Sequence, residues 1–291
     1  SSSAASDVYK RQVSNRGFEL DLRVHAIRKR DMSLIVNANL AHNKNKILKI
    51  SESLKAYNRR VQEKFEKATA FDSEVAEPFL QYEEGGSLNS IWGVRSMGIN
   101  PADGQEVYIK RDGSLTNNWI ASDQVVLGNT DPGAQGAIGL NFVYKQFSVF
   151  ASFMYEFGGD RYNQTLVDKV ENASLKGNVD KRVYNGRWRN PGDLKPYKTL
   201  GNQWVAEEGE YKDEKTQATS RFVQDRNELS LSSLRVGYDF WKHNFIKKVA
   251  MERLRVEFYM NDVFMLSSIK TERGTAYPFA RSFNFAIQAT F

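Results

Sequence analysis

The chain of 291 residues contains no cysteine. This absence excludes disulfides, thiolate catalysis and cysteine-based zinc sites. A long hydrophobic run is also missing, because no segment approaches the roughly 18 apolar residues that a membrane-spanning helix needs. A helical membrane protein is therefore excluded. A membrane β-barrel is compatible with the mean hydropathy of −0.56, because barrel strands alternate apolar and polar residues and dilute the signal.

The chain also has only a small excess of charge of one sign, and it has no catalytic motif. The net charge of +6 comes from 41 basic and 35 acidic residues with no long basic block, so no nucleic-acid partner is expected. His25, His42 and His243 lie far apart, and the acidic residues between Asp72 and Glu84 lack EF-hand spacing. No phosphate-binding loop, dinucleotide fingerprint or nucleophile–base set is found. We therefore expect no enzyme activity, no cofactor and no metal site, and only calcium in the loops stays open.

Aromatic residues, in contrast, are abundant. They make up 12% of the chain, with 18 Phe, 13 Tyr and 5 Trp. This content suits a barrel with aromatic girdles at the two membrane interfaces.

The N-terminal segment, residues 1–12 (SSSAASDVYKRQ), has no apolar region and is not a secretory signal. We interpret it as a non-native scar and residues 13–291 as a single domain. An exported protein needs a signal, so the natural N-terminus is expected to lie outside this sequence.

Seven segments alternate apolar and polar residues with the period of a β-strand. In the first, Phe18, Leu20 and Leu22 share one face, and Glu19 and Asp21 share the other. The segments span residues 18–27, 32–40, 138–145, 147–157, 233–240, 253–261 and 282–291. Most are about 9–11 residues long, the length that a tilted strand needs to cross a bilayer.

The connections between these segments alternate between short and long. Residues 28–31, 145–146 and 241–252 are short or moderate turns, whereas residues 43–136, 159–228 and 265–281 are long loops. This asymmetry is typical of outer-membrane barrels, with short turns in the periplasm and long loops outside. Charged residues on the polar faces are expected to line the lumen: Arg23, Arg235, Arg253, Arg255 and Glu257.

Seven strands do not close a bacterial barrel with the usual even number of strands. Open edges in lipid would leave backbone groups without hydrogen bonds. The predicted fold class is therefore all-β: a partial antiparallel transmembrane β-barrel, about seven C-terminal strands of a larger barrel, with long extracellular loops.

Several motifs, in this order, resemble the C-terminal region of SusC/RagA-like TonB-linked outer-membrane proteins of Bacteroidetes. Residues 15–20 (NRGFEL), 43–48 (NKNKIL) and 98–104 (GINPADG) are similar to the family patterns NRGxEL, YNKNKVL and GIDPxTG. Residues 123–136 (DQVVLGNTDPGAQG), 261–264 (NDVF) and 277–281 (YPFAR) are similar to DRxxIGNxxPKxxGG, QNLFT and YPxxR. The departures at 134–136 and 261–263 fall at variable positions, and the resemblance covers essentially Val13 to Phe291.

This resemblance implies a barrel of about 22 strands with a plugged lumen in the cell outer membrane of a Gram-negative bacterium. It implies uptake of oligosaccharides or peptides energised through TonB, which contacts an N-terminal region absent from this sequence. It also implies a SusD-like surface lipoprotein as a lid, with membrane lipid as the surroundings of the barrel.

Two groups of aromatic residues are candidate functional residues. The aromatic residues Phe283, Phe285 and Phe291 of the last segment are similar to the signal read by the barrel-assembly machinery, although an ordinary buried strand would have the same pattern. The loop tryptophans Trp92, Trp119, Trp188 and Trp204 could stack on a ligand or pack the loops together. Trp241 and Phe240 are better explained as part of a girdle.

Residues 51–69 predict a surface helix with a thin apolar stripe of Leu54, Val61, Phe65 and Ala68. It could contact the lipoprotein, but a solvated loop helix is the simpler interpretation. Two other functions stay open for the whole chain. One is an outer-membrane adhesin or structural barrel, and the other is a secreted β-protein that binds carbohydrate, which the apolar faces argue against.

Overall fold

The computed structural model describes residues 12–69, 72–173, 178–200, 202–205, 210–270 and 281–291. Residues 1–11 of the proposed scar and residues 277–280 of the YPFAR motif lie outside the described residues.

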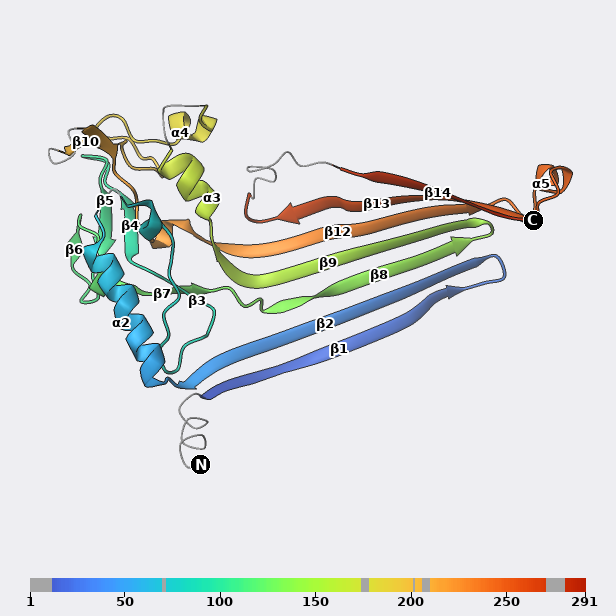
Figure 1. The fold of residues 1–291 in the computed structure, drawn as a ribbon, viewed down its shortest axis with the longest axis horizontal. Helices are drawn as coiled ribbons and strands as arrows, with labels where there is room; N and C mark the ends of the chain where they lie inside the picture. The colour runs from blue at the N-terminus through green and yellow to red at the C-terminus, as the bar shows by residue number, and fades with distance from the viewer. Residues whose placement is uncertain (1–11, 70–71, 174–177, 201, 206–209, 271–280) are drawn as a thin grey trace. The chain divides into compact units, whose positions relative to one another are not determined.

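Seven strands form one sheet in the order β1-β2-β8-β9-β12-β13-β14 (Figure 1). Their bounds are Gln12–Arg28 for β1, Met32–Lys49 for β2, Ala134–Tyr144 for β8, Phe147–Tyr162 for β9, Val223–Asp239 for β12, Arg253–Ser267 for β13 and Phe283–Thr290 for β14. Each strand neighbours the next one along this order, and the pairs are antiparallel. The predicted all-β, partial antiparallel sheet with two open edges is confirmed.

The pairing register places apolar residues opposite apolar residues on one face of the sheet. Leu140 of β8 pairs with Val36 on one side and Ala151 on the other, and Phe258 pairs with Val236 and Phe285. Because a shift of one residue would turn each side chain to the other face, this register keeps the apolar face continuous. The face is open to the surroundings of the chain, as for Phe285, which is 74% exposed.

The strands are longer than predicted. Strands β1, β2, β9, β12 and β13 have 17, 18, 16, 17 and 15 residues, so the expectation of about 9–11 residues is wrong for these five. The cause is that their ends continue beyond the apolar segment with polar sequences. At the end of β2, Ile47 is buried and exchanges backbone hydrogen bonds with Gly85 and Gly86, at 2.7 and 2.9 Å.

The strand alternation changes phase between β12 and β13. The register shifts between Leu231 and Ser233, and Asp262 on the facing strand has a φ of 49°. This is the left-handed conformation that Asp tolerates better than most residues. Beyond the bulge, Leu231 pairs with Phe264, and so the apolar pairing continues after the shift.

The connections alternate as predicted, with the three short ones at one end of the sheet and the three long ones at the other. The turn between β8 and β9 is tight, with Lys145 at a φ of 53°. The third short connection contains the helix α5, Asn244–Lys248.

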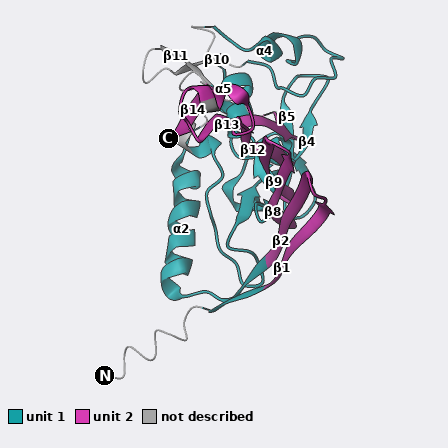
Figure 2. Ribbon diagram, turned by 90° about the vertical axis from the view of Figure 1, so that its right-hand side faces the viewer, with its two compact units in different colours: residues 1–16, 44–131, 160–225 teal, residues 17–43, 132–159, 226–291 magenta. Residues whose placement is uncertain are grey.

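The chain divides into two compact units made of interleaved segments (Figure 2). Residues 1–16, 44–131 and 160–225 form the first unit, which we call the loop unit, and residues 17–43, 132–159 and 226–291 form the second. The long connections β2–β8 and β9–β12 supply most of the loop unit.

The loop unit contains short strands and helices. Strand β3 (Ser90–Gly93) pairs with β7 (Val125–Asn129), β5 (Glu106–Ile109) pairs with β4 (Arg95–Ile99) and β6 (Leu115–Thr116), and β10 (Asn202–Val205) pairs with β11 (Glu210–Asp213). The helices and helical turns are α2 (Glu52–Lys67), η1 (Ser73–Ala76), η2 (Ala121–Asp123), α3 (Gln164–Leu166), η3 (Val167–Glu171), α4 (Lys181–Asn185) and η4 (Ser220–Phe222).

Helix α2 confirms the helix predicted at 51–69. Ser51 is its N-cap, and the Ser51 hydroxyl accepts a hydrogen bond from the backbone N–H of Leu54 at 3.3 Å. Val61 and Phe65 of the predicted stripe are buried in a cluster with Val75 and Ala121. The helix is therefore held by its apolar side, and its charged residues remain exposed.

Candidate functional site

The polar face of the sheet carries a network of charged side chains on β12 and β13. The Arg255 guanidinium donates to the Glu257 carboxylate at 2.8 Å, and the Tyr259 hydroxyl donates to the same carboxylate. The Arg235 guanidinium lies over the Tyr259 ring, 4.9 Å from its centroid. Arg253 pairs with Asp239 near the short connection. Of the five charged residues expected to line a lumen, four therefore lie in these two ion-paired groups.

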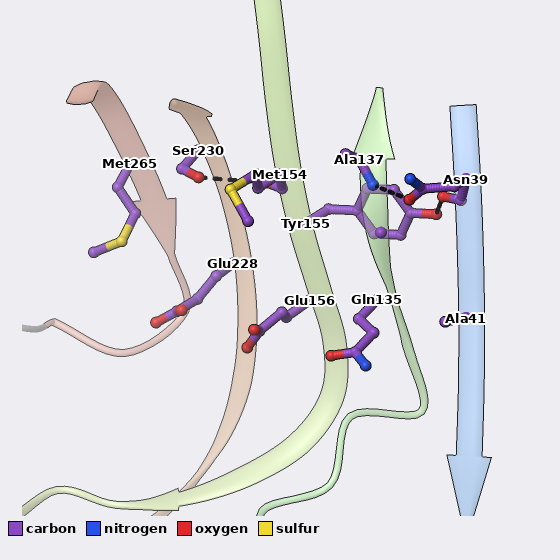
Figure 3. A pocket seen from close by; sticks show the side chains of 11 residues that line it. Asn39, Ala41, Gln135, Ala137, Met154, Tyr155, Glu156, Glu228, Ser230 and Met265 are labelled. Carbon is purple, nitrogen blue, oxygen red and sulfur yellow. Dashed lines mark hydrogen bonds between the residues drawn. The ribbon is translucent and has the colours of Figure 1, made fainter. Parts of the chain in front are cut away.

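A cavity of about 450 Å³ lies on this face nearer the long connections (Figure 3). Its lining is Asn39, Ala41, Gln135, Gly136, Ala137, Met154, Tyr155, Glu156, Glu228, Ser230 and Met265. The carboxylates and amides supply hydrogen-bond acceptors and donors, and the two methionines supply adaptable apolar surface. We call this cavity the polar groove.

The two carboxylates that line the polar groove each have a bonding partner. The Arg226 guanidinium pairs with the Glu156 carboxylate, and the Ser267 hydroxyl donates to the Glu228 carboxylate at 3.2 Å. Sequence analysis did not identify these groove residues. The only signal in the sequence was their position on the polar face near strand ends. The pairing of Arg226 with Glu156 gave no signal, because these residues are 70 positions apart in the sequence.

The backbone at the groove is fixed by a glycine–tyrosine pair. Gly136 of β8 is paired with Tyr155 of β9, and the Tyr155 hydroxyl donates to the Asn39 carbonyl oxygen at 2.8 Å. A Cβ on Gly136 would lie 2.1 Å from that same oxygen. The glycine thus permits close approach of the strands, and the tyrosine covers the gap that it leaves.

The loop unit is tied together by a buried charge cluster, Glu106, Glu171 and Arg221. The Arg221 Nη2 atom lies 2.6 Å from an oxygen of each carboxylate. Glu106 also accepts from the Thr219 hydroxyl at 2.8 Å, and Glu171 from the Thr216 hydroxyl at 3.0 Å. The cluster joins a residue of the first long connection to residues of the second.

Burial and charge oppose one another in this cluster. Burial alone would raise the pKa of Glu106, but hydrogen bonds and the charge of Arg221 outweigh burial and lower it. Burial alone would lower the pKa of Arg221, but its hydrogen bond to Glu106 and the charge of Glu171 raise it. Both groups are therefore charged in the folded loop unit, which stabilises the ion pair at neutral pH.

Three of the four loop tryptophans, Trp92, Trp119 and Trp188, occupy packed positions. Trp92 is 6% exposed. Trp119 lies 5.2 Å from the Phe65 ring and donates its indole N–H to the Ala218 carbonyl at 3.0 Å. Trp188 donates to the Pro101 carbonyl at 2.9 Å and covers Gly104. Trp204 lies in β10, opposite Tyr211. The three packed indoles make separate contacts, and ligand contact by the four tryptophans stays a prediction.

The predicted assembly residues lie at the end of the sheet. Phe283 and Phe285 belong to the edge strand β14, and their rings lie 6.1 and 5.3 Å from the Phe258 ring on β13. Phe291 follows this strand and is 80% exposed. Phe240, proposed with Trp241 as part of a girdle, lies 4.7 Å from the Tyr238 ring.

The described residues, 12–69, 72–173, 178–200, 202–205, 210–270 and 281–291, contain little that could bind a metal ion or span a membrane as a helix. Within these ranges, no group of three or more His, Asp or Glu side chains is arranged to hold a metal ion. Among the helices of the described chain, none has the length and apolar character to cross a membrane.

Comparison with known proteins bears on the family and the fold. No protein-family model matches the chain. It is 22% identical over 305 aligned residues to TonB-dependent receptor P39 of Formosa agariphila, and the match covers 88% of this chain and 27% of that protein. The chain thus spans about a quarter of the length of the curated relative.

Solved structures give the same fold. The RagAB peptide transporter superposes with a TM-score of 0.64 at 18% identity, covering 89% of this chain and 26% of that one. The RagAB peptide importer in its open-open state gives a TM-score of 0.63 at 17% identity, covering 90% and 26%. The resemblance to SusC/RagA-like TonB-dependent receptors and the partial-barrel fold are confirmed.

Proposed function

We propose that this chain, a TonB-dependent receptor fragment by its fold and its relatives, forms part of the wall of an importer in the outer membrane. The observation that carries the proposal is the seven-stranded antiparallel sheet with one continuous apolar face and one charged face. In this proposal, lipid chains contact the apolar face, while the opposite face borders an aqueous path. Residues 13–291 belong in this proposal to one barrel domain, with residues 1–12 as a scar.

The charged face suits the path of a hydrophilic solute. The Arg255–Glu257–Tyr259 network and the polar groove place donors and acceptors along the same side of the sheet. We propose oligosaccharides or peptides as the solutes, since both offer many hydrogen-bonding groups and some apolar surface. Among the loop tryptophans with described side chains, Trp119 and Trp188 are partly buried and leave surface for a ligand.

The proposed partners follow from the family. A SusD-like lipoprotein covers the side of the long connections, where the charged face of α2 is exposed. TonB acts through a region outside this chain, and the barrel-assembly machinery recognises the strand that contains Phe283 and Phe285. The protein that carries the chain works as a transporter and not as an enzyme.

Uptake by the source organism tests the proposal. The complete gene is deleted, and cells are supplied with labelled mixtures of peptides and of oligosaccharides. Loss of uptake of a subset of either mixture, restored by the intact gene, supports the importer. Normal uptake of both mixtures contradicts it, and loss of surface adhesion alone favours an adhesin or structural barrel.

A further inference from the structure

The apolar face of the first two strands ends in cations. Along β2, the residues of this face run in the order Met32, Leu34, Val36, Ala38, Leu40, His42, Lys44 and Lys46. Along β1, Leu20 and Phe18 are followed on the same face by Arg16. The change from apolar to cationic occurs toward the end of the strands from which the long connections leave.

Burial fixes the direction of these side chains. Asn45, which lies between the two lysines, is 7% exposed, and Ile47, which follows Lys46, is 1% exposed. The Asn45 amide donates to Asp131 at 2.5 Å and accepts from the Ser87 hydroxyl at 2.9 Å. Since neighbouring residues of a strand point to opposite faces, Lys44 and Lys46 point away from this buried group, and both are exposed.

Arg16 lies across the strand pair from Lys44. A Cβ on Gly17 would lie 2.2 Å from the His42 carbonyl oxygen and 3.1 Å from the Asn43 Cα. Because the strands of this hairpin run in opposite directions, the residue before Gly17 is opposite the residue after Asn43. The three cations Arg16, Lys44 and Lys46, here called the cationic rim, therefore share one surface.

The cationic rim has no ion-pair partner among the described residues. Two acidic residues, Glu83 and Glu84, belong to the turn whose glycines exchange hydrogen bonds with Ile47. The Glu84 carboxylate accepts a hydrogen bond from the Ile50 backbone N–H at 3.2 Å. The three cations are therefore exposed and open to an anion from outside the chain.

We propose that the cationic rim binds the phosphate groups of a lipid in the leaflet next to the long connections. The inference rests on the proposed membrane function, because the apolar face beside the rim is then in contact with lipid chains. Phosphates lie at the boundary of the hydrocarbon region, where Lys and Arg extend their charged ends from an apolar surface. Arginine binds phosphate through two parallel hydrogen bonds, and lysines add point charges.

Lipid binding by the full-length receptor tests this inference. The variant R16Q/K44Q/K46Q is compared with R59Q/R60Q/K67Q, which removes the same charge from exposed positions on α2. Binding is measured to nanodiscs that contain lipid A with its phosphates and to nanodiscs with dephosphorylated lipid A. Each cation near an anionic membrane surface contributes about a fivefold change in binding, so the rim variant is expected to bind phosphorylated lipid about a hundredfold more weakly.

The expected pattern is weak binding by the rim variant, wild-type binding by the α2 variant, and weak binding of dephosphorylated lipid by all proteins. Equal binding by the rim variant and the wild type overturns the proposal, as does an equal loss in the α2 variant. Heat-dependent mobility in gel electrophoresis reports barrel formation separately. If the wild-type protein forms a barrel but binds phosphorylated and dephosphorylated lipid equally, the proposal for the cationic rim alone is refuted. If the wild-type protein never inserts into a membrane, the proposed membrane function is refuted.

Discussion

Replacement of Arg221 by methionine is expected to lower the free energy needed to unfold the loop unit. Glu106 is 3% exposed and Glu171 is 1% exposed, so the substitution leaves two buried carboxylates without their cation. Loss of one partner of a buried ion pair costs about 3–5 kcal/mol. The two threonine hydroxyls that also bond these carboxylates offset part of this cost, which places the expected effect near ~3 kcal/mol.

Hydrogen exchange in the full-length protein measures this effect. A loss of ~3 kcal/mol corresponds to roughly a hundredfold faster exchange at β5 and η4, where exchange follows the opening equilibrium. R226M is the matched control, because the Glu156 side chain that pairs with Arg226 is 39% exposed, and such pairs contribute about 0–1 kcal/mol. A change below about tenfold in R221M, or one equal to that of R226M, would refute the reasoning.

A replacement of the whole cluster separates charge from packing. In E106M/E171M/R221M the three charges of this cluster are removed together, and exchange of ion-paired groups for apolar residues is often neutral or stabilising. We expect this triple variant to exchange more slowly than R221M. Exchange as fast as in R221M would show that the side chains act through shape and not through charge.

The remaining predictions concern pH and the two faces of the sheet. Because the pKa of Glu106 is lowered in the folded state, its contribution to stability is present above the unfolded-state pKa of about 4.3 and is lost as pH falls through the folded-state pKa. The protection factor at β5, which is the intrinsic exchange rate at each pH divided by the observed rate, should therefore stay constant from about pH 7 to 5 and fall below about pH 4. A fall already at about pH 6 would contradict this. L140R, on the apolar face between Val36 and Ala151, should destabilise the barrel by about 2–4 kcal/mol. It should therefore lower the temperature at which the folded gel mobility is lost, whereas N141R on the polar face should change this temperature little. Equal shifts in the two variants would argue against a lipid-facing side. G136V places its Cβ against the Asn39 carbonyl and should lower the same temperature more than Y155F, which loses one hydrogen bond worth about 1 kcal/mol; the reverse order would contradict the close strand approach.

The sequence pattern was sufficient for the central parts of the sheet. Alternation between Phe18 and Leu22, or between Leu254 and Phe258, identifies a strand because one face is apolar and the other polar. The order of the motifs then gave the resemblance to SusC/RagA-like proteins, which the relative and the solved structures support. The strand ends escaped prediction because residues such as Asn45 and Ile47 are buried by the loop unit, and no local period records that packing.

The site could be predicted only in outline. The polar side of Arg235, Arg255 and Glu257 follows directly from alternation, but their ion pairs depend on the register between β12 and β13. The cluster of Arg221 with Glu106 and Glu171 joins residues 115 and 50 positions apart. Such contacts are set by the folding of two long connections, which carry no repeating pattern.

The most direct test of the central claim is the chemical accessibility of the two faces of β9 in the full-length protein. The chain has no cysteine, so single cysteines at Ser148, Val149, Ala151 and Ser152 can be labelled with little background from this region. In outer membranes, a water-soluble maleimide is expected to label S148C and S152C, whereas V149C and A151C are expected to react only with a lipid-soluble maleimide. Equal labelling of all four positions by the water-soluble reagent would contradict a membrane barrel wall.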